Sequence, residues 1–305
     1  MGGLPATVVA DVFHRAWART ALLHRAFLRP WLQQLYARRR DPAGAARDLE
    51  QPSLSGFPVQ PAIRCPPGTL SELRNAMEPV ILVIPTFNEA ETIGAAIREI
   101  PAAYRLNIIV ADGGSTDGTP RIARIAGARV VNAGRGYGRA CALGAEKAHP
   151  ASTVIAFMDG DGADRGDLID EIARPVLDGA YDLVLASRTR GEREPGAMLW
   201  HQVLAGRIAG FGCGAPYGMQ YSDMCAFRAI SREALECLAL QEMTYGWNIE
   251  MQMKAARARL RILEVPLPYR RRRGGSSKVA GSFRGTLRAG SRIAATFCRV
   301  AASAS

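Results

Sequence analysis

From Pro79 onward, short apolar segments alternate with helix-like segments, and this alternation constrains the fold more than any other feature. The apolar segments are Val80–Pro85, Asn107–Ala111, Val130–Asn132, Val154–Met158 and Leu183–Ala186. The helix-like segments between them are Glu89–Glu99, Thr119–Ile125, Ala140–Ala148 and Asp167–Asp178. Such an alternation is typical of a mainly parallel, Rossmann-like α/β sheet with helices on both faces. We therefore expect ligands at the carboxyl ends of the strands.

The residues before this alternation have a different composition. Residues 8–40 are rich in arginine and apolar side chains with a loose helical period, and residues 41–68 contain six prolines. A Pro-rich stretch is typical of a linker. We expect residues 1–78 to be an extension that is either disordered or a membrane-surface helix, with Met77 as an alternative translation start. A single folded domain is expected at 79–290, followed by a tail at 291–305.

The distribution of charge narrows the possible partners. Residues 257–305 carry 12 basic side chains and one acidic side chain, whereas residues 79–256 carry 17 basic and 21 acidic ones. The basic end suits phosphates, an anionic membrane or nucleic acid, and a solvated tail is the alternative. The sequence has no apolar run of about 18 residues and no signal-peptide pattern, so we expect a cytoplasmic protein with possible peripheral contact at the inner face of the membrane.

Polar motifs follow the first two predicted strands. The first strand leads into Pro85-Thr86-Phe87-Asn88-Glu89, where Asn88 is a candidate cap for a helix starting near Glu89. The second leads into Asp112-Gly-Gly-Ser-Thr-Asp-Gly-Thr119. Its glycines permit close backbone approach to a ligand, and Asp112 can accept hydrogen bonds from a base or ribose. A plain turn is the alternative for each motif.

The fourth predicted strand ends in the acidic sequence Asp159-Gly-Asp161-Gly-Ala-Asp164. The glycines allow a bend that brings the carboxylates of Asp159 and Asp161 to one ion. Carboxylate ligands suit Mg²⁺ or Mn²⁺, which also bind substrate phosphates. The spacing and the terminal Glu of an EF-hand calcium loop are absent, and an acidic surface turn is the remaining alternative.

Taken in order, these motifs resemble those of the family 2 glycosyltransferases, which have the GT-A fold. The segment Ala186-Ser187-Arg188 resembles the family's Gly-Ser-Arg, with Ala in place of Gly. The basic sequence from Arg271 to Lys278 resembles a loop of the dolichyl- and polyprenyl-phosphate mannose synthase branch. The resemblance covers residues 79–290 and implies a catalytic domain that uses a nucleotide-diphosphate sugar as donor.

The resemblance also implies roles for individual residues. Glu89 and Asp112 would hold the nucleotide in a pocket shaped by Pro85 and Phe87, and Asp159 and Asp161 would bind the metal that bridges the diphosphate. Arg188, Arg273 and Lys278 would face the donor and acceptor phosphates. The sequence departs from the branch in two respects: Ala163 stands where a Gln ligand is usual, so Asp164 or water would complete the metal shell, and the C-terminal membrane helices are missing.

The acceptor decides whether the reaction needs a base. A polyprenyl phosphate, which the resemblance favours, offers an oxygen that is already nucleophilic, whereas a neutral hydroxyl needs a carboxylate base. Asp223 and Glu250 are the candidates for that base, each with a structural role as the alternative. A sugar-nucleotide nucleotidyltransferase is a second alternative, although the Gly- and Arg-rich loop that is usual after its first strand is absent. Binding of nucleic acid would leave the acidic turn unexplained, and we expect none.

Overall fold

The computed structural model describes residues 79–105, 107–198, 200–275 and 283–303. Within these residues, seven strands form one sheet in the order β3-β2-β1-β4-β6-β5-β7. The strands are β1 (Val80–Thr86), β2 (Ile108–Asp112), β3 (Arg129–Asn132), β4 (Val154–Phe157), β5 (Leu183–Ser187), β6 (Arg228–Ser231) and β7 (Ile262–Pro266). Strand β6 is antiparallel to both neighbours, and the other described pairings are parallel. The predicted mainly parallel α/β sheet is confirmed.

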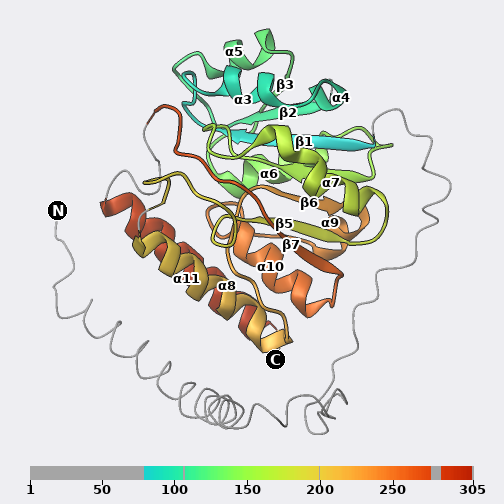
Figure 1. Ribbon diagram of the computed structural model, residues 1–305, viewed down its shortest axis with the longest axis vertical. Coiled ribbons are helices and arrows are strands. Elements are labelled where there is room, and N and C mark those ends of the chain that lie inside the picture. The colour runs from blue at the N-terminus through green and yellow to red at the C-terminus, as the bar shows by residue number, and fades with distance from the viewer. Residues whose placement is uncertain (1–78, 106, 199, 276–282, 304–305) are drawn as a thin grey trace, which may run out of the picture. The chain divides into compact units, whose positions relative to one another are not determined.

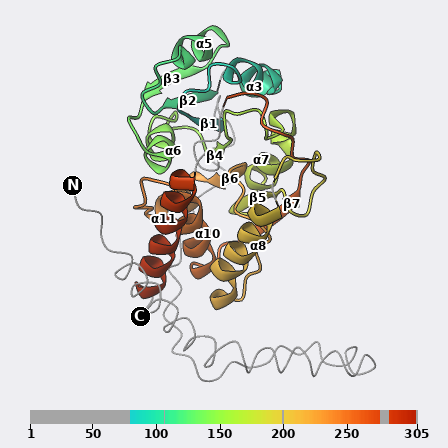
Figure 2. The same cartoon turned by 90° about the vertical axis from the view of Figure 1, so that its left-hand side faces the viewer.

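Helices cover both faces of the sheet (Figures 1 and 2). One face carries α3 (Ile93–Glu99), α4 (Ala102–Arg105), α5 (Thr119–Ile125) and α7 (Ile169–Leu177). The other carries α6 (Tyr137–Glu146), α9 (Arg232–Leu238) and α10 (Trp247–Arg257). Helices α8 (Trp200–Gly214) and α11 (Phe283–Ala302) pack against α10. Strand β1 is buried along its whole length because its alternating side chains enter both layers.

The strand register brings three loops to one edge of the sheet. Thr86 at the end of β1 lies beside Asp112 at the end of β2, and Asp112 lies beside Asn132 at the end of β3. Strand β4 pairs with β1 in the same direction, with Phe157 opposite Val83. The segments after β1, β2 and β4 therefore start next to one another, as the position of motifs after parallel strands predicts.

The predicted boundaries agree with the observed ones at the strands and differ more at the helices. The helix predicted at Ala140–Ala148 is observed at Tyr137–Glu146, and the one predicted at Asp167–Asp178 is observed at Ile169–Leu177. All five predicted strands occur within one residue of their expected bounds. The first helix begins at Ile93 rather than near Glu89, because residues 90–92 form turns. Strands β6 and β7 were not predicted. The search of the described residues finds no helix with the length and apolar character needed to cross a membrane.

Candidate functional site

Hydrogen bonds join the loop after β1 to the loop after β2. The N–H of Asn88 donates to Ser115 Oγ at 2.8 Å, and Asn88 Oδ1 accepts from the N–H of Thr116 at 2.9 Å. The N–H of Glu89 donates to Thr119 Oγ1 at 2.9 Å. Asn88 adopts a φ of 52°, a left-handed conformation that asparagine tolerates better than most residues. The prediction that Asn88 caps a helix is therefore wrong, because its side chain fixes the neighbouring loop instead.

Asp112 is buried at the end of β2 and organises the glycine-rich turn that follows it. Its Oδ2 accepts from the N–H groups of Gly114 at 3.0 Å and Ser115 at 2.9 Å, and its Oδ1 accepts from Ser115 Oγ at 2.5 Å. A carboxylate has about four lone-pair positions, and the fourth is occupied by a longer bond from Thr86 Oγ1 to Oδ1 at 3.4 Å. A donor group of a ligand would therefore have to replace the Thr86 hydroxyl. The turn is thus fixed in place by the same side chain that the sequence assigns to the nucleotide.

The acidic turn after β4 concentrates negative charge. The N–H of Asp159 donates to Asp164 Oδ2 at 3.1 Å, and Asp161 Oδ1 accepts from the N–H of Ala163 at 2.9 Å. Burial, together with the carboxylates of Asp164 and Asp161, raises the pKa of Asp159 well above its ordinary value. Burial and the carboxylate of Asp161 raise the pKa of Asp164 to about 7. Carboxylates placed this close favour the binding of a cation.

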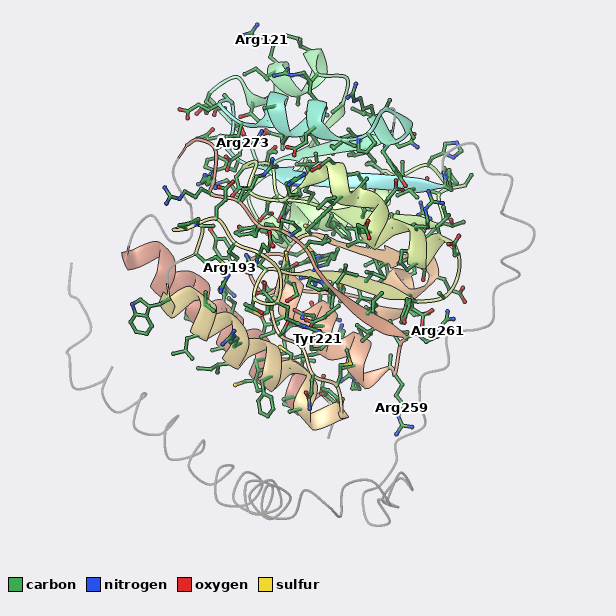
Figure 3. The ribbon with its side chains drawn as sticks, in the orientation of Figure 1. Arg121, Arg193, Tyr221, Arg259, Arg261 and Arg273 are labelled. Carbon is green, nitrogen blue, oxygen red and sulfur yellow. The ribbon has the colours of Figure 1, made fainter. Side chains whose placement is uncertain are left out.

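A basic segment, Arg270–Arg273, lies directly on this acidic turn. The N–H of Arg270 donates to the carbonyl oxygen of Ala163 at 3.1 Å, and the N–H of Arg273 donates to that of Asp161 at 3.1 Å. The stem of Arg273 covers Gly162, where an added Cβ would lie 3.2 Å from Arg273 Cδ. Gly162 also has a φ of 77°, so both space and conformation favour glycine there. Figure 3 shows Arg273 in the loop that crosses this end of the sheet.

Arg272 joins the first and fourth strand ends. Its Nη1 donates to Asp161 Oδ2 at 3.0 Å, and its Nη2 is paired with Glu89 Oε2. Its side chain is 22% exposed, and that of Glu89 is 9% exposed. The guanidinium therefore lies between a carboxylate assigned to the metal and one assigned to the nucleotide. The sequence placed Arg272 in a basic loop but gave no sign of these two partners.

Arg188, at the end of β5, forms an ion pair with Asp223. Its Nε donates to Asp223 Oδ2 at 2.7 Å and its Nη2 to Oδ1 at 2.8 Å, while its backbone N–H donates to Oδ2 at 3.1 Å. The Asp223 side chain is fully buried and that of Arg188 is 21% exposed. Although burial opposes ionisation, the guanidinium of Arg188 holds the pKa of Asp223 below its ordinary value. The two candidates thus form a two-bond pair, and a carboxylate held in this way is a weak base.

A cation–π contact joins the segment after β1 to the segment after β3. The guanidinium carbon of Arg135 lies 3.7 Å from the ring centroid of Phe87, within the range of a cation–π contact. Phe87 is half-buried and Pro85 is buried within β1. Arg135 was not among the predicted residues. The sequence Gly134-Arg135-Gly136 is typical of a turn after the third predicted strand but does not show the contact with Phe87. In the structure both glycines adopt positive φ shortly after β3.

Two predicted site residues, Glu250 and Lys278, are not among the described residues that meet at this edge of the sheet. Glu250 on α10 is fully buried, where its Oε2 accepts from the N–H groups of Gln241 at 3.0 Å and Glu242 at 2.7 Å, and its Oε1 pairs with Lys254 Nζ at 3.0 Å. These bonds fix the segment between α9 and α10. Lys278 lies outside the described residues.

The acidic turn can supply some of the ligands of a metal ion, with the remaining ligands coming from a substrate and from water. The described residues contain no group of three or more His, Cys, Asp or Glu side chains arranged to hold a metal on their own. Mg²⁺ and Mn²⁺ are commonly bound by one or two carboxylates, with phosphate oxygens and water completing the shell. The two carboxylates of Asp159 and Asp161 therefore fit a metal that arrives with a diphosphate.

The chain is similar to known proteins over the part that carries this site. The sequence model of "Glycosyl transferase family 2" matches residues 81–239. An uncharacterized glycosyltransferase of Mycobacterium tuberculosis is 35% identical over 217 residues, which cover 70% of this chain and 94% of the relative. The dolichyl-phosphate hexose transferase of Haloferax volcanii is 33% identical over 198 residues, covering 63% and 83%.

A solved structure shares the fold. It is the glucosyl-3-phosphoglycerate synthase of M. tuberculosis in complex with Mn²⁺, uridine diphosphate and phosphoglyceric acid, which has a TM-score of 0.56 and 22% identity and covers 77% of this chain and 83% of its own. This likeness confirms the GT-A fold expected from the sequence. The matches to the family and to its members show that the chain is an enzyme of glycosyltransferase family 2.

Proposed function

We propose that the enzyme transfers a sugar from a nucleoside-diphosphate sugar to a polyprenyl phosphate. The observation that carries this proposal is the meeting of the acidic turn Asp159–Asp164 with the basic segment Arg270–Arg273 at the carboxyl edge of the sheet. Carboxylates suit the metal of a metal–diphosphate complex, and guanidinium groups suit phosphate oxygens. Relatives named as dolichyl-phosphate hexose transferase and undecaprenyl-phosphate mannosyltransferase support the choice of acceptor.

On the donor side, Asp159 and Asp161 hold Mg²⁺ or Mn²⁺ and the nucleotide lies along the ends of β1 and β2. Phe87 and Pro85 form one wall of its pocket, and Glu89 and Asp112 accept hydrogen bonds from it. A structural neighbour that binds Mn²⁺ and uridine diphosphate supports this arrangement. The bound metal would supply positive charge beside the diphosphate as it leaves.

On the acceptor side, an oxygen of the polyprenyl phosphate attacks the anomeric carbon while the bond from that carbon to the diphosphate breaks. No proton has to be removed, because the phosphate oxygen is already anionic. Arg188, Arg273 and Lys278 stabilise the phosphate charges, with fixed positive charge placed where negative charge develops. Asp223 positions Arg188 in this proposal, in keeping with its depressed pKa and two-bond pairing.

A soluble phosphorylated acceptor is the second candidate, favoured by the neighbour solved with phosphoglyceric acid. The purified chain would be incubated with Mn²⁺, labelled UDP-, GDP- or dTDP-sugars, and either a polyprenyl phosphate in detergent or 3-phosphoglycerate. We expect label only in the lipid. Label only in 3-phosphoglycerate would replace the proposed acceptor, and label in neither would contradict the proposal.

The matched variants for this experiment are two arginine substitutions. Arg273 lies on the acidic turn, whereas the exposed Arg121 lies on α5 and points away from the protein at the top of Figure 3. We expect Arg273→Ala to lower turnover by about a hundredfold, the loss that follows removal of one charge-stabilising donor. Arg121→Ala should leave turnover unchanged, and equal effects of the two substitutions would refute the role of Arg273.

A further inference from the structure

Helix α8 exposes a continuous apolar stripe. Its members are Trp200, Leu204, Ile208 and Phe211, which are 76%, 49%, 64% and 40% exposed. At 100° per residue these positions fall within an arc of about 80°, so they form one row along the helix. Most large apolar side chains elsewhere in the described residues are buried. An exposed row of this kind marks a contact surface.

The opposite face of α8 lies against the candidate site. Added Cβ atoms at Gly206 and Gly210 would lie 3.2 Å from Asp223 Oδ1 and 2.8 Å from the carbonyl oxygen of Tyr221. The glycines of α8 therefore let the helix pack closely against residues 221–223, which include the Asp223 partner of Arg188. Its outer row is separated from that segment by about one helix diameter, roughly 10 Å.

The charge that α8 itself places beside the stripe is positive, as an anionic headgroup requires. Helix α8 contains Arg207 and no Asp or Glu, and Arg207 is exposed at a helical position about 20° from Trp200. Arg193 and Glu194 are both exposed and line a surface hollow together with Trp200, where Glu194 accepts a hydrogen bond from the N–H of Arg271 at 2.8 Å. In such a row the apolar side chains can insert among lipid chains while tryptophan and arginine lie at the level of the headgroups.

The size of the stripe argues against a second copy of the chain as the occupant. With full side-chain areas of roughly 150–250 Å², the four exposed fractions amount to an apolar surface on the order of 450 Å². A stable protein interface needs about 800 Å² on each partner. A bilayer surface has no such minimum area, because the strength of reversible binding increases gradually with the buried apolar area and with attraction to anionic lipids.

We propose that the outer face of α8 is a contact surface for an anionic lipid bilayer. This contact would place the Arg188–Asp223 pair close to the headgroup layer. The inference extends the proposed function, since a polyprenyl phosphate is reached from the membrane. It is nevertheless tested separately, because binding to vesicles requires neither donor nor acceptor.

The test is flotation of the full-length chain with vesicles of phosphatidylcholine containing 30% phosphatidylglycerol or none. We expect binding to the anionic vesicles and at least fivefold weaker partitioning of the Leu204→Ser/Ile208→Ser variant. Ile125→Ser is the matched control, because Ile125 is a single exposed isoleucine (72%) on α5. It should bind as the unsubstituted protein does.

Three outcomes would overturn the inference. The first is that the unsubstituted chain does not bind the vesicles. The second is that the double variant binds as well as the Ile125→Ser control, which would place the contact elsewhere on the protein. The third is that sedimentation without lipid shows a dimer of the unsubstituted chain and a monomer of the double variant. This result would mean that a second copy of the chain covers the stripe. Normal vesicle binding without sugar transfer would leave this inference standing and contradict the proposed function alone.

Discussion

At the scale of single residues, the site depends on ion pairs between segments that are far apart in the sequence. Arg272 reaches Glu89 across 183 positions and Asp161 across 111. Its guanidinium lies beside a carboxylate that the proposed function assigns to the metal. A divalent ion at Asp161 must therefore compete with Arg272 for that carboxylate.

Removing this competitor should tighten the binding of metal without donor. We expect Arg272→Gln to lower the Mn²⁺ dissociation constant by roughly tenfold, or about 1.4 kcal/mol, a magnitude between that of exposed and buried ion pairs. Electron paramagnetic resonance of free Mn²⁺ measures this directly, with Arg121→Gln as the control. Unchanged or weaker Mn²⁺ binding in Arg272→Gln would show that the two cations do not share the site.

The Arg188–Asp223 pair gives stability a defined pH dependence. The pKa of Asp223 is lower in the folded protein than in the unfolded chain, where it is about 3.9. The ionised carboxylate therefore stabilises the fold above that value, and this contribution is lost as the pH falls toward the folded-state pKa. Replacement of Asp223 by Asn leaves Arg188 without its partner.

We expect Asp223→Asn to lower the free energy of unfolding by about 3 kcal/mol at pH 7, the cost of breaking a buried pair. The difference should shrink between pH 5 and pH 3. Urea unfolding at several pH values measures it, and Asp178→Asn, an exposed position, should stay within about 0.5 kcal/mol of the unsubstituted protein. A difference for Asp223→Asn that is constant from pH 7 to pH 3 would contradict this account of the pair.

The residues at the strand ends could be predicted, whereas their partners could not. Asp112, Asp159 and Asp161 follow apolar strands directly, so local pattern was sufficient to place them at one edge. The pairing of Arg272 with Glu89 depends on how a loop near the C-terminus returns over the sheet. No local periodicity carries that information. Arg135 was missed because its contact with Phe87 joins the ends of two different strands.

At the scale of elements, glycines decide how closely helices approach the sheet. Gly144 of α6 lies so close to β1 that an added Cβ would meet Val83 Cγ1 at 2.3 Å, while nothing lies within 4 Å of a Cβ at Gly290 of α11. Both glycines lie inside helices, where alanine is favoured by about 1 kcal/mol when space permits. The two positions therefore separate helix propensity from packing.

We expect Gly290→Ala to raise the free energy of unfolding by about 0.5–1 kcal/mol. Gly144→Ala should lower it by about 1–3 kcal/mol, the usual cost of overpacking a core. Denaturant unfolding of the two variants side by side measures both values. If Gly144→Ala were as stable as Gly290→Ala, the close packing of α6 on β1 would be incorrect.

The elements that were predicted are those with strong local patterns. The five apolar strands occur where expected, because buried parallel strands form continuous apolar runs. Strand β6 (RAIS) is short and begins with a buried arginine, so its sequence does not form the apolar run that predicts a buried strand. The first helix begins late because Asn88 bonds to the neighbouring loop rather than to the helix.

At the scale of the whole molecule, acidic and basic segments that are far apart in the sequence lie next to each other in the fold. The acidic excess of residues 79–256 includes the turn after β4, and the basic excess of residues 257–305 includes Arg270–Arg273. The fold brings these two segments into hydrogen-bond contact. The charges therefore balance one another locally, and the proposed function assigns them to a ligand that carries both a divalent cation and phosphate groups.

The measurement that tests the central claim most directly is Mn²⁺-dependent transfer of labelled sugar by the Asp161→Asn variant. The account predicts that transfer falls by about a hundredfold or more, the scale of losing a charge-stabilising group in a site, while circular dichroism and the melting temperature stay close to those of the unsubstituted chain. Unchanged Mn²⁺-dependent transfer by a folded Asp161→Asn variant would contradict the assignment of Asp161 to the metal and, with it, the proposed donor site.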